Sequence, residues 1–176
     1  GELFALICLT KQLPTVKMKY LTMKYLPHAR QDRVKKHTDV FTLKYFCEVI
    51  NSLNFDSVCI LDPHSNVSAA LFNNVLIAQP EEEIAASLRA INDDVVLFFP
   101  DEGSQKRYSD MFDLPYAYGL KKRDWKTGNI LSLDVIDNGI DLKDKTILIV
   151  DDICSKGGTF YHSAKKLKEL GAGEIY

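Results

Sequence analysis

The segment that most constrains the fold is residues 146–159, which read TILIVDDICSKGGT. Four consecutive aliphatic residues, 147–150, predict a strand covered on both faces, as in a parallel sheet. Asp151 and Asp152 follow at the carboxyl end of that strand, where open α/β sheets place their ligand sites. Such an acid pair can hold sugar hydroxyls or a metal ion, and the glycine turn before the next helical pattern can hold a phosphate. An ordinary strand-to-helix loop is the alternative interpretation of the same residues.

Strand patterns and helical patterns alternate along the rest of the chain, which predicts an α/β fold with mainly parallel sheets and flanking helices. A length of 176 residues allows one domain or two small ones. The β-α series restarts near residues 72–75, so we predict two domains, residues 1–73 and 74–176. The chain starts without Met in a helical pattern and stops in a strand-like one, so we expect both domains to be incomplete.

The composition excludes several classes of protein. With 26% charged and 46% hydrophobic residues, the chain has the composition of a soluble globular protein. The net charge of −2 argues against general nucleic-acid binding. The apolar run at residues 3–9 is too short to span a bilayer and follows no basic region. No cysteine lies in a C-x-x-C pair, which favours reduced thiols and a cytoplasmic location.

Further polar loops follow other predicted strands. They are the pair Arg30-Gln31, the run from Asp62 to His64, the run from Asp101 to Arg107, and the cationic run from Lys121 to Arg123. Diphosphoryl transfer needs this inventory, because it requires Mg²⁺ ligands, cations that stabilise the transferring phosphates and a cradle for the acceptor. Taken alone, a single His64 is more often structural than a metal ligand.

These motifs carry a family resemblance. Residues 146–159 resemble the phosphoribosyl-diphosphate (PRPP) binding motif of type I phosphoribosyltransferases and PRPP synthetases. Four further runs resemble motifs of ribose-phosphate diphosphokinase (PRPP synthetase) in the same order: ARQD at 29–32, DPHS at 62–65, PDEGSQKR at 100–107 and LKKR at 120–123. The resemblance implies two phosphoribosyltransferase-like domains in a homo-oligomer, a dimer or a hexamer.

The resemblance also implies a reaction and a role for individual residues. The family transfers the diphosphoryl group of Mg-ATP to the C1 hydroxyl of ribose 5-phosphate, giving PRPP and AMP for nucleotide or NAD biosynthesis. It implies that Lys121 and Arg123 are catalytic, that Arg30, Gln31 and His64 bind ATP, and that His64 and Asp101 hold Mg²⁺. It assigns the ribose 5-phosphate site to Asp151, Asp152, Ser155, Lys156, Gly157, Gly158 and Thr159.

Two departures and two alternatives accompany this interpretation. Ser155-Lys156 stands where the family usually has Asp-Thr, and the sequence after Arg123 differs from the family's catalytic loop. A type I nucleobase phosphoribosyltransferase, which consumes PRPP, would share residues 146–159 but does not need Arg30-Gln31 or His64 with Asp101. A non-catalytic regulatory protein of the PRPP-synthetase type is the other alternative, and we would expect it to have lost Lys121 or His64.

Overall fold

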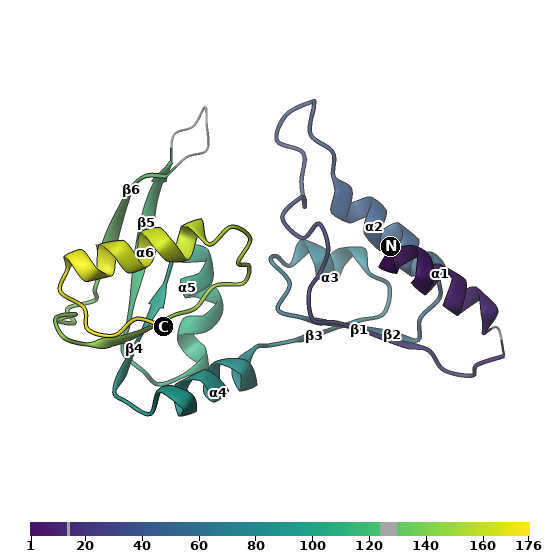
Figure 1. The fold of residues 1–176 in the computed structure, drawn as a ribbon. Helices are drawn as coiled ribbons and strands as arrows, with labels where there is room; N and C mark the ends of the chain where they lie inside the picture. The colour runs from purple at the N-terminus through teal and green to yellow at the C-terminus, as the bar shows by residue number, and fades with distance from the viewer. Residues whose placement is uncertain (14, 124–129) are drawn as a thin grey trace. The chain divides into compact units, whose positions relative to one another are not determined.

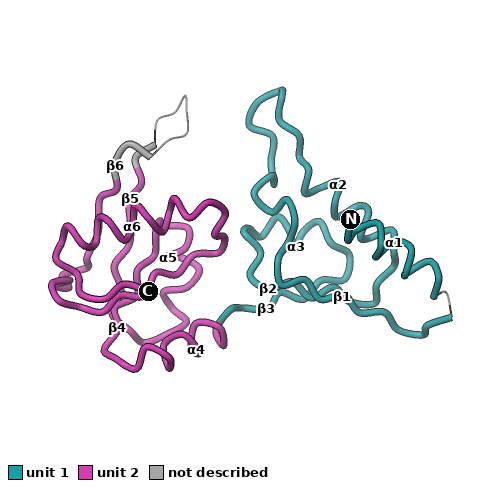
Figure 2. The backbone as a smooth tube through the Cα atoms, in the orientation of Figure 1, with its two compact units in different colours: residues 1–80 teal, residues 81–176 magenta. Residues whose placement is uncertain are grey.

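The computed structural model describes residues 1–13, 15–123 and 130–176, and their side chains except those of residues 122, 123 and 130–132. The chain divides into two compact units, residues 1–80 and 81–176 (Figure 2). Among the described residues, each unit contains one β-sheet with flanking helices (Figure 1). The predicted α/β class with mainly parallel sheets is confirmed.

The first unit has a three-stranded parallel sheet in the order β1-β2-β3. The residues of β2 alternate between buried and half-buried side chains, so the sheet presents one face to the main core. Leu43, Cys47 and Ile50 lie on one face of α2 and pack there against Val58 and Ile60. The elements are α1 (Glu2–Gln12), β1 (Tyr20–Met23), α2 (Thr42–Ser52), β2 (Ser57–Leu61), α3 (Val67–Leu71) and β3 (Val75–Ala78).

The second unit has a four-stranded sheet in the order β6-β5-β4-β7, in which β4 pairs in parallel with β5 and β7 while β6 is antiparallel to β5. Its elements are α4 (Glu81–Ile91), β4 (Val95–Phe99), α5 (Glu102–Tyr108), a 3₁₀ turn η1 (Ser109–Met111), β5 (Tyr116–Arg123), β6 (Ile130–Ile136), β7 (Thr146–Ile149) and α6 (Gly158–Glu169).

Helices cover both faces of β4, which explains its unbroken apolar sequence. Val96 and Phe98 pack in a core with Leu167 of α6. The alternate residues of β4, at positions 95, 97 and 99, face the opposite way, into a second core with Ile84 of α4 and Tyr108 of α5. Figure 1 shows α6 on one side of this sheet and α4 with α5 on the other. Strand β7 is buried along its whole length as well. The loops that follow β4 and β7 are therefore both attached to strands packed inside the core.

The two units divide at a different residue from the predicted domain boundary. The sequence patterns placed the boundary after residue 73, whereas the first compact unit extends to Pro80. The reason is that β3 pairs with β2, with Val58 opposite Val75 and Leu61 opposite Ala78. A restart of the β-α pattern is visible in a sequence, but the sheet that a strand joins is decided by its hydrogen-bonded partner. Within the described part of the chain, no helix has the length and apolar character needed to cross a membrane.

Candidate functional site

Several site residues predicted from the sequence lie at or just after the carboxyl ends of β4, β5 and β7. These strands are parallel to one another, so their carboxyl ends lie at the same edge of the second sheet. Asp101 follows β4 after the buried Pro100, Lys121 lies near the end of β5, and the acid pair follows β7. The structure therefore brings the second unit's predicted metal acid, catalytic lysine and ribose-binding acids to one edge.

Asp101 is the N-cap of α5 and the ion-pair partner of Lys121. One carboxylate oxygen, Oδ1, accepts hydrogen bonds from the backbone N–H and the hydroxyl of Ser104, both at 3.1 Å. The other, Oδ2, lies 3.0 Å from Nζ of Lys121. Burial alone would raise the pKa of Asp101, but the Ser104 N–H and the Lys121 ammonium outweigh it, and the pKa is lowered. Asp101 is therefore an ionised carboxylate with both oxygens bound to protein donors.

Gly119 makes this arrangement possible, because the backbone after β4 passes directly over it. A Cβ atom on Gly119 would lie 2.6 Å from the carbonyl oxygen of Pro100 and 2.7 Å from Cδ1 of Leu133. Real Cβ atoms do not approach that closely, so any side chain at this position would push the turn containing Asp101 away from β5. Glycine here sets the distance between Asp101 and Lys121.

The two adjacent acids after β7 have different surroundings. Asp152 has a side chain only 5% exposed, and its Oδ2 lies 3.6 Å from Nη1 of Arg107. The guanidinium of Arg107 in turn stacks over the buried ring of Tyr108, 4.8 Å from its centroid. Burial, and then the negative charge of Asp152, raise the pKa of Asp151 to about 6. The sequence predicted no role for Arg107, although Arg107 is the last residue of the PDEGSQKR run, which carries part of the family resemblance.

The predicted phosphate loop connects Asp152 to α6. Helix α6 begins at Gly158, and its N-cap Gly157 has the left-handed φ of +71°, which favours glycine. No side chain caps this helix, so the N–H groups of its first turn are left for an anion. Ser155 and Lys156 are exposed and Thr159 is half-buried within that turn. These features suit the phosphate-binding role implied for residues 155–159.

In the first unit, a buried carboxylate joins two loops that carry the predicted ATP-binding residues. Asp32 is 4% exposed and accepts hydrogen bonds from Nε and Nη2 of Arg33, at 2.7 and 2.8 Å. It also accepts one from Oγ of Ser65, at 2.7 Å, and Ser65 follows His64 in the loop after β2. Hydrogen bonds from Arg33, and to a smaller extent from Ser65, lower the pKa of Asp32 to about 2 although burial alone would raise it. The Asp32–Ser65 bond brings the ARQD and DPHS runs together.

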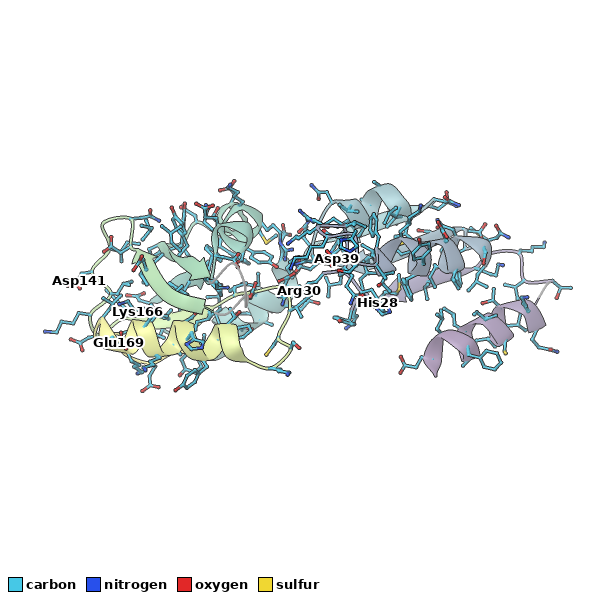
Figure 3. The ribbon with its side chains drawn as sticks, turned by 90° about the horizontal axis from the view of Figure 1, so that it is seen from above. His28, Arg30, Asp39, Asp141, Lys166 and Glu169 are labelled. Atoms are coloured by element: carbon cyan, nitrogen blue, oxygen red, sulfur yellow. The ribbon has the colours of Figure 1, made fainter. Side chains whose placement is uncertain are left out.

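The other residues predicted to bind ATP lie in the loop after β1. The backbone N–H of Gln31 donates to the carbonyl of His28 at 2.8 Å, and its carbonyl accepts from the N–H of Leu43 at 3.3 Å. The side chains of Gln31 and His28 are also in hydrogen-bond contact, at 3.1 Å. Arg30 is exposed, and Figure 3 shows it in the same loop as His28. This loop is thus held against the start of α2 by its backbone hydrogen bonds.

The roles of Arg123 and of the predicted Mg²⁺ ligands also remain predictions. Arg123 ends β5, but its side chain and the whole of residues 124–129 lie outside the described part of the structure. The Mg²⁺ assignment combines His64 of the first unit with Asp101 of the second. Among the described residues, no three His, Cys, Asp or Glu side chains form a group that could hold a metal ion. A nucleotide-borne Mg²⁺ still fits, because phosphate oxygens and water supply most of its ligands.

Comparison with known proteins supports the family resemblance. No family model matches the chain. It is 28% identical to the ribose-phosphate pyrophosphokinase of Saccharolobus solfataricus over 99% of the chain and 60% of that protein. It is 30% identical to the one of Pyrococcus abyssi, over 89% of the chain and 54% of that protein. For the one of Clostridium perfringens the identity is 31%, over 86% and 49%. The chain thus spans about half to three fifths of these relatives.

A solved structure gives the same answer for the fold. The crystal structure of phosphoribosylpyrophosphate synthetase from Mycobacterium smegmatis superposes with a TM-score of 0.79 at 21% identity. The match covers 98% of this chain and 57% of the synthetase chain. Because the identity is low, this match supports the fold alone. Together with the curated relatives, it confirms that this chain resembles the ribose-phosphate pyrophosphokinases along nearly its whole length.

Proposed function

We propose that the protein containing this chain transfers the diphosphoryl group of Mg-ATP to the C1 hydroxyl of ribose 5-phosphate. The observation that carries the proposal is the shared sheet edge at which Lys121 and the acid pair lie. The uncapped start of α6 follows the same edge after a short loop. A sugar phosphate needs hydroxyl acceptors and an anion site, and a transferring phosphate needs a nearby cation. The similarity to named ribose-phosphate pyrophosphokinases supports the same reaction.

In this reaction the C1 hydroxyl oxygen forms a bond to the β-phosphorus of ATP. The bond between that phosphorus and the oxygen leading to the α-phosphorus breaks, AMP leaves, and the hydroxyl proton is released to solvent. No covalent enzyme intermediate is needed. Asp151 and Asp152 orient the ribose hydroxyls, while the N–H groups at the start of α6 and Thr159 hold the 5-phosphate. Lys121, with Arg123, neutralises charge that develops on the transferring group.

The nucleotide occupies the other group of predicted residues. Arg30, Gln31 and His64 bind ATP on loops that Asp32 and Ser65 hold together. Mg²⁺ bound with ATP would neutralise the phosphate oxygens, and His64 is the residue of the first unit that would hold it. The enzyme is expected to be a cytoplasmic homo-oligomer, a dimer or a hexamer, as the resemblance implies. Analytical ultracentrifugation of the full-length protein measures the oligomer.

The direct test is to incubate the full-length protein with ATP, ribose 5-phosphate and Mg²⁺ and to identify the products. Formation of AMP and PRPP in equal amounts supports the proposal. Formation of pyrophosphate from PRPP and a nucleobase, without AMP from ATP, would instead establish a nucleobase phosphoribosyltransferase. If the protein binds PRPP but catalyses neither reaction, it is a regulatory protein of this fold.

The role of Lys121 is tested by steady-state kinetics of Lys121→Ala. Losing one preorganised donor that acts in the transition state typically lowers turnover roughly a hundred- to a thousandfold, with little change in the Michaelis constant for ATP. Lys36→Ala is the matched control, because Lys36 is exposed and belongs to none of the predicted binding or catalytic sites. Unchanged turnover with a raised Michaelis constant for ATP would mean that Lys121 is a binding residue.

A further inference from the structure

The ammonium group of Lys121 is unusually enclosed for a lysine. Its side chain is only 6% exposed, and Nζ lies 3.0 Å from Oδ2 of Asp101. A buried ammonium is costly unless an anion is paired with it. The carboxylate of Asp101, whose side chain is 42% exposed, provides that anion. The position of the Lys121 ammonium therefore depends on Asp101.

Asp101 is itself held in place by independent contacts. Its Oδ1 is fixed by the N–H and hydroxyl of Ser104, and the Ser104 side chain is in turn within reach of the Asp101 backbone N–H, which completes a capping box. Pro100, which is fully buried, and Gly119, which has no room for a Cβ, fix the backbone on either side of the ion pair. With Oδ1 committed to α5, the carboxylate can present only Oδ2 to Lys121.

The same contacts argue against a resident metal ion at Asp101. Both of its oxygens already accept protein donors, one of them a cation that would repel Mg²⁺. A cavity of about 530 Å³ opens beside the pair and is also lined by Glu102 and Asp134. Even so, the described residues contain no group of three metal-ligating side chains. The donor set around Asp101 fits a lysine anchor better than a metal site.

We propose that Asp101 is the positioning residue of Lys121, and that its carboxylate holds the ammonium at the carboxyl edge of the sheet. This inference rests on the proposed function, in which Lys121 acts on the transferring phosphate. Asp101 then contributes to turnover through Lys121, and Asp101 is not needed to bind a metal ion. The capping of α5 and the anchoring of Lys121 use different oxygens of the same carboxylate, so a substitution can separate them.

Asp101→Asn in the full-length protein makes that separation. The amide oxygen retains the cap of α5, since Asn is as good an N-cap as Asp, while the charge that holds Lys121 is lost. We expect turnover to fall on the order of a hundredfold, with the Michaelis constant for ATP changed by less than about threefold. Asp134→Asn is the matched control, because it removes one exposed carboxylate from the same cavity. It is expected to leave both constants close to those of the wild type.

Two further measurements separate the inference from its competitors. Mn²⁺ binding to the protein alone, followed by electron paramagnetic resonance, should be equal in wild type and Asp101→Asn. Loss of Mn²⁺ binding in the variant would establish Asp101 as a metal ligand and overturn the proposal.

Acetylation of Lys121 by acetic anhydride, quantified by mass spectrometry relative to Lys36, should become faster in Asp101→Asn and not in Asp134→Asn. This readout needs no activity, so it decides on the anchor even if the proposed reaction fails. Equal acetylation in all three proteins, or unimpaired turnover of Asp101→Asn in an active enzyme, would refute it.

Discussion

Asp32→Asn tests whether one buried carboxylate ties the ARQD loop to the DPHS loop. In the first unit, Asp32 accepts hydrogen bonds from Nε and Nη2 of Arg33 and from Oγ of Ser65. An asparagine has nearly the same shape, but its NH₂ group would face a donor instead of accepting from one. The substitution therefore removes the charge and at least one of these bonds without opening a cavity.

The expected loss of stability follows from the pKa of Asp32, which is lowered from 3.8 to about 2. A shift of that size corresponds to about 2.4 kcal/mol at neutral pH. Arg33 supplies most of it from a side chain that is 58% exposed, so solvent screening reduces the figure to about 1–1.5 kcal/mol. Because the folded-state pKa lies below the unfolded one, this stabilisation is present above about pH 4 and is lost as the pH falls through about 2.

Cys47 provides a local probe for this effect. It is 1% exposed in the core of the first unit, and burial raises the pKa of its thiol to about 11. A labelling reagent therefore reaches it only when the first unit opens. At neutral pH, pulsed labelling followed by mass spectrometry of the Cys47 peptide should show opening that is about five- to twelvefold more frequent in Asp32→Asn. The matched control is Glu48→Gln, an exposed acid-to-amide change on α2, which should label at the wild-type rate.

Urea denaturation followed by far-UV circular dichroism tests the pH dependence. The difference between wild type and Asp32→Asn should be full at about pH 7 and much smaller at about pH 2, where Asp32 is almost fully protonated in the unfolded state and about half protonated in the folded state. Unaltered labelling of Cys47 in the variant would mean that the buried carboxylate does not stabilise the first unit. A difference that is the same at both pH values would show that its charge is not the cause.

Three further predictions concern the second unit. Asp151→Asn should stabilise it at about pH 7.5 and have little effect at about pH 3. The folded-state pKa of the half-buried Asp151 is raised from 3.8 to about 6, so stability is lost as the pH rises between these values and Asp151 ionises beside Asp152. Urea midpoints at the two pH values measure this, and a destabilised variant at about pH 7.5 would contradict it. Gly119→Ala should cost about 1–3 kcal/mol by overpacking against Pro100, and a thermal melt that matches the wild type would refute the close approach. Gly157→Ala should lower the free energy of unfolding by about 1–2 kcal/mol, because the φ of Gly157 is +71° although the space around it is open. The control Gly158→Ala, in the first turn of the same helix, should be neutral or stabilising. Equal thermal shifts of the two variants would disprove backbone strain at Gly157.

Much of the fold was predictable because burial on both faces leaves a local signature. The continuous apolar runs of β4 and β7 required helices on both sides, and the structure provides α6 on one and α4 with α5 on the other. The loop between β7 and α6 was predictable for a similar reason, since a strand, an acid pair and a glycine turn follow one another directly along the chain. The boundary between the two units was not, because the pairing of β3 with β2 is set by tertiary hydrogen bonds.

The sequence by itself determined which residues stand at the ends of the strands, and therefore identified Lys121, Asp101 and the pair Asp151-Asp152 as candidate site residues. It could not determine how their charges are paired, because that depends on distances between side chains of different strands. Only the tertiary structure joined Asp101 to Lys121 and Asp152 to Arg107. Burial then made those pairings decisive, since an ion in a poorly solvated site takes its protonation state and position from whichever partner lies within a few ångströms.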